Sequence, residues 1–130
     1  MMEHMEKARQ LRACTDIHYN CAQSLLVTFA EEMGLSEEQA YALGAHFGSG
    51  MRHGSTCGAI TGALMVLGML GYDEATATSL LRTVREGHGA LDCATLLRTS
   101  HEAGIPRKQH CDGIVFEMLA AVEAIIAANK

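Results

Sequence analysis

Apolar residues return every three or four positions along nearly the whole chain, the spacing that places them on one face of an α-helix. The clearest run lies between residues 22 and 33 and stops at Gly34, a residue type that commonly ends helices. Strands would instead show strict alternation of apolar and polar residues, and we find no such segment. The pattern therefore predicts an all-α protein, built as a bundle of about six helices.

Capping residues predict where these helices begin. Ser36 and Gln39 have the sequence pattern of a capping box, and the helix that they open is expected to turn Leu43 inward. Asp73 is a favourable residue type for a helix start, and Pro106 breaks the chain before the last helix. The predicted helices span residues 22–33, 36–47, 56–71, 73–88, 92–99 and 111–128.

The length of the chain suits one domain. Its 130 residues are enough to enclose a hydrophobic core, and apolar residues make up 48% of them. No linker or shift in composition divides the sequence, so residues 1–130 are expected to form a single helical domain. Residues 1–15 are also expected to be helical, although this segment is more polar than the others.

Charge and hydropathy exclude several classes of function. The net charge is −5 and the isoelectric point is about 5.7, so the chain lacks the positive footprint of a nucleic-acid binder. Its longest apolar stretch, residues 59–70, is shorter than the roughly 20 residues that a membrane span needs. The acidic N-terminus does not resemble a secretory signal. We therefore expect a cytoplasmic protein with no membrane insertion and no nucleic-acid partner.

Five cysteines are many for a chain of this size, and four of them lie near predicted helix starts. These four are Cys21, Cys57, Cys93 and Cys111, whereas Cys14 lies in a polar stretch. A helix N-terminus lowers the pKa of a nearby thiol, because the helix dipole and free backbone amides stabilise the thiolate. Since the thiolate attacks disulfides, these four are the candidate catalytic residues. Cys57 follows a glycine-rich loop and is expected to be the exposed thiolate of low pKa.

The same placement admits two other interpretations. Small cysteine side chains also pack at helix ends without any chemistry. Alternatively, the four cysteines hold zinc or an iron–sulfur cluster; because no C-x-x-C spacing is present, the ligands would have to come from separate helices. His18, His53, His88 and His110 each lie within five residues before one of these cysteines. His53 shares the glycine-rich loop with Cys57 and is the preferred additional ligand or base.

The order of the four cysteines resembles the C_GCAxxG_C_C family of small redox-active proteins. The resemblance rests on Asn20-Cys21-Ala22-Gln23, on Cys57-Gly58-Ala59-Ile60-Thr61-Gly62, and on the later Cys93 and Cys111. The family label places glycine before its second cysteine, whereas here Gly58 follows Cys57. The resemblance covers most of the chain and leaves Cys14 outside the pattern.

The resemblance implies a helical protein of bacterial or archaeal type, associated with electron transfer and oxidoreductase systems. A related domain in a split-Soret-type cytochrome uses cysteines to hold an iron–sulfur cluster, so the resemblance also implies that a cluster is an option here. The chain has no C-x-x-C-H sequence, and covalent attachment of haem is therefore not supported.

Three functional hypotheses remain open at this point. The first is thiol redox chemistry or electron transfer by Cys57 with one or more of Cys21, Cys93 and Cys111, in exchange with a redox partner protein. The second is a metal-binding or cluster-binding module without thiol exchange. The third is a non-catalytic helical interaction protein with a methionine-rich face. A small apolar bundle with few charges is also compatible with a homodimer.

Overall fold

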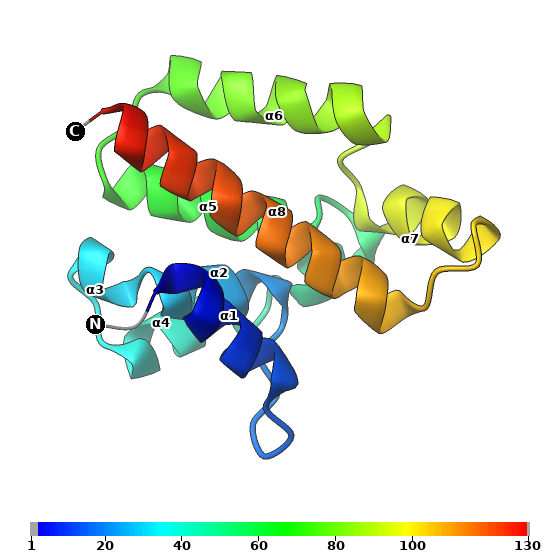
Figure 1. Cartoon of the computed structure of the whole chain (residues 1–130), viewed down its shortest axis with the longest axis horizontal. Coiled ribbons are helices and arrows are strands. Elements are labelled where there is room, and N and C mark those ends of the chain that lie inside the picture. The colour runs from blue at the N-terminus through cyan, green and yellow to red at the C-terminus, as the bar shows by residue number, and fades with distance from the viewer. Residues whose placement is uncertain (1–2, 130) are drawn as a thin grey trace.

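A computed structural model describes residues 3–129 of the chain, and these residues form an all-α structure, as the sequence predicts (Figure 1). Residues 1, 2 and 130 lie outside the description, so the first two positions of the predicted N-terminal helix are not covered. The described residues contain eight α-helices and one π-helical turn, η1: α1 (His4–Ala13), α2 (Cys21–Thr28), α3 (Ala30–Met33), α4 (Glu37–Gly44), η1 (Gly50–Gly54), α5 (Gly58–Met69), α6 (Glu74–His88), α7 (Cys93–Glu102) and α8 (Arg107–Ala128).

The core forms where α2, α5 and α8 pack together. Every residue of α2 after its first is buried, which is unusual for a helix of its size and places it at the centre of the molecule. Helix α5 packs along α2, and α8 crosses both, while α1 covers α2 and α8 from the other side (Figure 1). The fully buried side chains of Phe29, Leu25, Ile60 and Leu119 lie in this single core cluster.

Helix ends follow the capping signals closely. The Ser36 hydroxyl accepts a hydrogen bond from the Gln39 amide at 3.0 Å, and the Gln39 side-chain oxygen accepts one from the Ser36 amide at 2.9 Å. Asp73 caps α6 by accepting from the Thr76 amide at 3.0 Å. Gly34 ends α3 with φ of 74°, a left-handed conformation that glycine adopts without steric cost.

Several features differ from the sequence prediction. The predicted helix 22–33 is divided at Phe29, whose backbone leaves the helical region while its side chain stays fully buried. Leu43 is exposed rather than inward, because α4 turns only a narrow face towards α2. Helix α7 continues to Glu102, three residues past its predicted end. Helix α8 begins at Arg107, directly after Pro106, and so starts one turn earlier than predicted.

The glycine-rich segment before α5 forms a tight turn with left-handed backbone. Ser49, Gly50, Met51 and Arg52 all have positive φ, between 54° and 70°. A Cβ atom on Gly50 would lie 2.2 Å from the Ser55 carbonyl oxygen, so only glycine fits at this position. The predicted positive-φ loop is therefore confirmed.

The sequence predicts that no segment spans a membrane. Among residues 3–129, we find no helix with the length and apolar character required to cross a membrane.

Candidate functional site: a cavity lined by thiols

The four cysteines singled out by the sequence line one cavity. Cys21 is the first residue of α2, Cys57 directly precedes α5, and Cys93 is the first residue of α7. Cys111 lies on α8, one turn inside the helix rather than at its start. The cavity, which we call the thiol cavity, has a volume of about 480 Å³ and also reaches the exposed Cys14. The structure thus brings together four helices that are far apart in the sequence.

Cys21 is positioned by a capping box that the sequence analysis did not identify. The Asn20 side chain accepts a hydrogen bond from the Gln23 amide at 2.7 Å, and the Gln23 side chain accepts one from the Asn20 amide at 2.9 Å. The Asn20 side-chain amide also donates to the carbonyl of Gly44 at 3.0 Å. These bonds fix the start of α2 against the end of α4, and with it the place of Cys21.

Cys57 and Cys93 are held together through their backbones. The Cys57 amide donates to the Leu91 carbonyl at 2.9 Å, and the Cys93 amide donates to the Ser55 carbonyl at 2.7 Å. This pair of bonds forms a short antiparallel bridge that ties the segment before α5 to the segment before α7. Two thiols that are 36 positions apart in the sequence are thereby placed on the same wall of the thiol cavity.

Two glycines of the motif let α5 approach α2 closely. A Cβ atom on Gly58 would lie 2.7 Å from the Phe47 carbonyl oxygen and 3.4 Å from the Cβ of Cys21. A Cβ atom on Gly62, one turn later, would lie 3.0 Å from the Cβ of Leu25. Side chains larger than hydrogen at these positions would push α5 away and separate Cys57 from Cys21.

Cys57 does not have the environment that the sequence predicts. Its side chain is buried, with 6% of the residue exposed, and burial raises the pKa of the thiol. The amides of Ala59 and Ile60 lower the pKa in part, although the sulfur makes no regular cap hydrogen bond. The expectation of an exposed Cys57 with low pKa is therefore wrong, because desolvation outweighs the helix N-terminus.

Cys21 and Cys111 form a hydrogen-bonded pair with opposite shifts. The hydrogen-bonding interaction with the Cys111 sulfur, together with burial, raises the pKa of Cys21. The same bond, followed by the positive charges of Arg12 and Arg107, outweighs burial and lowers the pKa of Cys111 to about 6. Near neutral pH the pair therefore shares one proton and one negative charge, and the opposite pKa shifts favour the charge on Cys111.

Arg12 and Arg107 line the thiol cavity and lower the pKa of Cys111, and the sequence analysis did not identify them. Arg12 lies at the end of α1, where its side chain is 10% exposed and bonds to Asp112 at 2.7 Å. Arg107 opens α8 and donates a hydrogen bond to the Ser49 hydroxyl at 3.0 Å. Pro106 is a local signal that the last helix begins near Arg107, since proline interrupts the preceding helical segment. Only the packing of α1 on α8 brings Arg12 close to Cys111.

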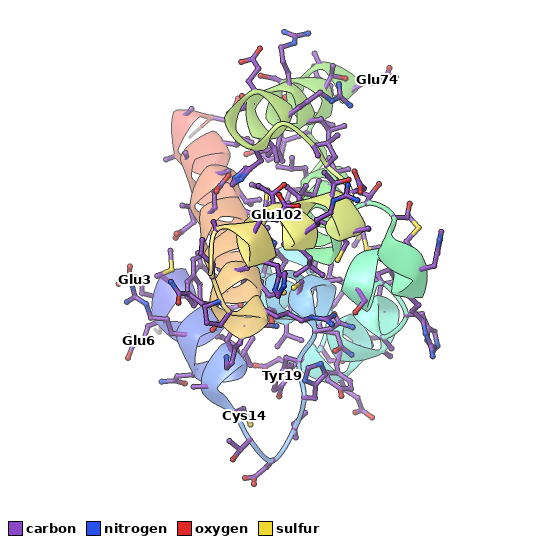
Figure 2. The ribbon with its side chains drawn as sticks, turned by 90° about the vertical axis from the view of Figure 1, so that its right-hand side faces the viewer. Glu3, Glu6, Cys14, Tyr19, Glu74 and Glu102 are labelled. Carbon is purple, nitrogen blue, oxygen red and sulfur yellow. The ribbon has the colours of Figure 1, made fainter. Side chains whose placement is uncertain are left out.

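The remaining cysteines of the cavity, Cys93 and Cys14, have different surroundings. Burial raises the pKa of Cys93, and the neighbouring Cys111 charge adds to the shift, while Arg107 opposes it. Cys14 is exposed and lies at the start of the loop that joins α1 to α2, with Tyr19 near its other end (Figure 2). Cys14 thus lies at the mouth of the thiol cavity rather than on its inner wall.

The histidines divide into two groups. His18 and His110 line the thiol cavity, and the His110 ring is hydrogen-bonded to the Ser100 hydroxyl at 2.6 Å. His53 is exposed and does not line this cavity, and His88 bonds instead to Glu117 at 2.8 Å. The structure therefore places the preferred histidine of the sequence analysis away from the thiols.

A ready metal site is not found at the cavity. No group of three or more His, Cys, Asp or Glu side chains within residues 3–129 converges so that it could hold a metal ion. The sulfur donors suit zinc or iron in their chemistry, but their arrangement around the cavity does not fit a preformed metal or cluster site. We therefore derive no chemical step through a metal or cluster.

Comparison with known proteins connects this arrangement to a family. The family model described as "Putative redox-active protein (C_GCAxxG_C_C)" matches residues 19–125. The chain belongs to the C_GCAxxG_C_C family. The matched segment includes the four cysteines from Cys21 to Cys111 and excludes Cys14, and it indicates a redox-related role. No match was found among curated proteins or among solved structures.

Proposed function

We propose that this C_GCAxxG_C_C protein is a dithiol–disulfide redox protein that uses Cys111 and Cys21. The observation that carries the proposal is that Cys21 and Cys111 interact on the wall of one cavity, where the pKa of Cys111 is lowered and that of Cys21 is raised. The family description supports redox chemistry in general, and the pair supplies a specific chemical form for it.

Cys111 is the attacking residue in this proposal. Thiol–disulfide exchange is fastest when the attacking thiol has a pKa near the ambient pH, because it is then largely ionised and still nucleophilic. The pKa of Cys111, lowered to about 6, meets this condition, whereas that of Cys21 is raised. Cys21 therefore stays protonated at first and acts as the resolving thiol, which attacks after the mixed disulfide has formed.

The reaction is a balanced two-electron exchange. The Cys111 thiolate attacks one sulfur of a substrate disulfide, forms a mixed disulfide and releases the other half as a thiolate. That leaving thiolate takes the proton of Cys21, and the Cys21 sulfur then attacks the Cys111 sulfur. The products are a Cys21–Cys111 disulfide and the two halves of the substrate, one as a thiol and one as a thiolate. The protein dithiol is oxidised and the substrate disulfide is reduced.

Cys57 and Cys93 have a different place in the proposal. Their pKa values are raised by burial, so both thiols stay protonated near neutral pH and are slow to attack. They line the same cavity and are available to exchange with the Cys21–Cys111 disulfide after the first reaction. The initial attack on substrate does not require them.

Competitive alkylation tests this assignment. The reduced Cys14→Ser protein is treated briefly with iodoacetamide between pH 5 and 9, and the modified cysteines are identified by mass spectrometry. We expect Cys111 to be modified first, with a midpoint near pH 6. First modification of Cys57, or four equally slow thiols, would contradict the proposal. Iron or zinc bound in stoichiometric amount after anaerobic purification would favour the metal-binding alternative instead.

A further inference from the structure

The thiol cavity is positively charged although the whole chain is acidic. Arg12, Arg107 and Lys108 line it, and none of its lining residues is Asp or Glu. The chain as a whole carries a net charge of −5, so this local excess of positive charge runs against the average of the sequence. Such a contrast within a concave site attracts ligands of the opposite sign.

Only part of this positive charge is neutralised by neighbouring carboxylates. Asp112 bonds to both Arg12, at 2.7 Å, and Lys108, at 2.9 Å, so one carboxylate serves two cations. Arg107 has no carboxylate within ion-pair distance among residues 3–129; its bonds go to the Ser49 hydroxyl and the Cys111 sulfur. Three cations against Asp112 and the Cys111 thiolate leave one positive charge.

The size of the cavity limits which ligands can bind beside this positive charge. Its volume of about 480 Å³ lies within the range of about 300–1,000 Å³ that small-molecule sites span. Cys21 and Cys111 lie on its wall and are only partly exposed, so a small disulfide reaches them more easily than a folded protein surface does.

We propose that the substrate of the thiol cavity is a small disulfide that carries carboxylate groups, seated by Arg107 beside Cys111. This inference rests on the function proposed above. One carboxylate binds the Arg107 guanidinium and places the nearer sulfur of the substrate against the Cys111 sulfur. The exchange then proceeds as described: Cys111 bonds to that sulfur, the other half leaves as a thiolate, and Cys21 displaces the bound half. The guanidinium changes neither protonation nor oxidation state.

Three symmetric disulfides of different charge test the proposal. Dithiodiglycolate carries two carboxylates, bis-hydroxyethyl disulfide is neutral, and cystamine carries two ammonium groups. Their second-order rate constants with the reduced Cys14→Ser protein are measured at low ionic strength, each divided by its rate constant with a free small thiol. We expect dithiodiglycolate to react fastest and cystamine slowest, with a ratio of about tenfold or more, which falls as salt is added.

Variants show whether the selectivity comes from Arg107. Arg107→Gln should lower the dithiodiglycolate-to-cystamine ratio at least threefold. A change in the pKa of Cys111 cancels in this ratio, because the same thiolate attacks both probes, so a merely structural role would leave the ratio unchanged. Arg82→Gln removes the same charge from an exposed position on α6, outside the cavity, and should leave the ratio as it is.

The outcomes distinguish a failure of this substrate proposal from a failure of the proposed dithiol function. Equal normalised rates for the three disulfides, or an unchanged ratio in Arg107→Gln, would overturn the substrate class and leave the dithiol function standing. Failure of all three disulfides to oxidise Cys111 would overturn the dithiol function itself.

Discussion

A cysteine is reactive when its surroundings favour the thiolate over the thiol. The cavity contains one cysteine environment that favours the thiol and one that favours the thiolate. Cys57 precedes a helix, yet it is buried among apolar side chains and stays a thiol. Cys111 lies within a helix, but a thiol donor and two guanidinium groups face it and favour the thiolate. Local charges and hydrogen bonds therefore outweigh the position relative to a helix end.

Removing the thiol donor should weaken the thiolate. In Cys21→Ala the hydrogen bond to Cys111 is lost, so we expect the pKa of Cys111 to rise toward the ordinary value of a cysteine. At pH 7 the alkylation rate of Cys111 should fall roughly tenfold, since a rise of about two pKa units from about 6 leaves roughly a tenth of the sulfur as thiolate. Cys57→Ser serves as the control and should change the rate little. An unaltered alkylation midpoint in Cys21→Ala would show that Cys21 does not support the thiolate.

The four cysteines that line the cavity could be selected from the sequence, but the surroundings of each could not. Capping residues before Cys21 and Cys93 and the glycines around Cys57 are local signals, and they mark helix starts correctly. The low pKa of Cys111 depends on Arg12, which is 99 positions away. No spacing rule connects these two residues, because only tertiary packing brings them together.

The contact between α2 and α5 determines how close the thiols of these helices can come. Gly58 and Gly62 lie one turn apart on the face of α5 that touches α2, with Ala22 opposite them. This stripe of small residues lets the two helix backbones approach closely. It gives Gly58 and Gly62, the two glycines that follow Cys57 in this chain, a structural role.

Adding a methyl group in this contact should destabilise the protein. In Gly62→Ala the new Cβ would lie 3.0 Å from the Cβ of Leu25 and 3.1 Å from the Ala22 carbonyl oxygen. We expect the free energy of unfolding, measured with urea, to fall by about 1–3 kcal/mol from overpacking. Gly68→Ala lies on the same helix with nothing within 4 Å and should gain up to about 1 kcal/mol from helix propensity. Equal effects of the two substitutions would contradict the close-packing argument.

The docking of α1 should depend on pH through His4. The His4 ring bonds to Glu32 at 2.7 Å and to Glu123 at 3.1 Å, joining α1 to α3 and α8. Burial lowers the pKa of His4, but these carboxylates outweigh it and the pKa is raised overall. Its contribution to stability is therefore full below the pKa of the unfolded chain, about 6.5, and is lost as pH rises through the higher folded value.

Unfolding of His4→Gln across pH checks this linkage. The stability difference between wild type and His4→Gln should be largest near pH 5 and should shrink above neutral pH. His53→Gln, at an exposed position, is the matched control and should show no such trend. A difference that grows with rising pH would be opposite in sign to the expected linkage.

Some helix boundaries are determined by local capping signals, and others by tertiary packing. The capping boxes and glycines mark most helix ends to within a residue or two, because their hydrogen bonds involve near neighbours. The division at Phe29 has no comparable sequence signal; Phe29 is fully buried and its ring lies 4.5 Å from that of His4. Tertiary packing, rather than helix propensity, determines the conformation there.

The thiol cavity belongs to the whole molecule rather than to any one helix. Its walls come from α1, α2, α5, α7 and α8, together with the loops that lead into them, so it exists only when both ends of the chain are packed together (Figure 1). No Asp or Glu lines the cavity, so it is positive although the chain as a whole is acidic. An all-α fold and a set of cysteines were predictable from periodicity and composition, whereas the cavity and its charge arise from long-range contacts.

Oxidation should therefore stabilise the molecule as a whole. A Cys21–Cys111 disulfide would close a loop of about 90 residues and restrict the unfolded chain, which typically adds about 2–4 kcal/mol to stability. Urea unfolding of the oxidised and reduced Cys14→Ser protein measures this difference. Cys21→Ser cannot form the bond and should lose most of the increase. An oxidised protein that is no more stable than the reduced one would argue against a cross-link between α2 and α8.

The most direct test of the account identifies the first disulfide that forms. The reduced Cys14→Ser protein is oxidised with one equivalent of dithiodiglycolate, remaining thiols are blocked, and the peptides are mapped by mass spectrometry. The account predicts a peptide pair joined by Cys21 and Cys111, with Cys57 and Cys93 blocked as free thiols. A first disulfide that joins Cys57 to Cys93, or the recovery of all four cysteines as free thiols, would contradict it.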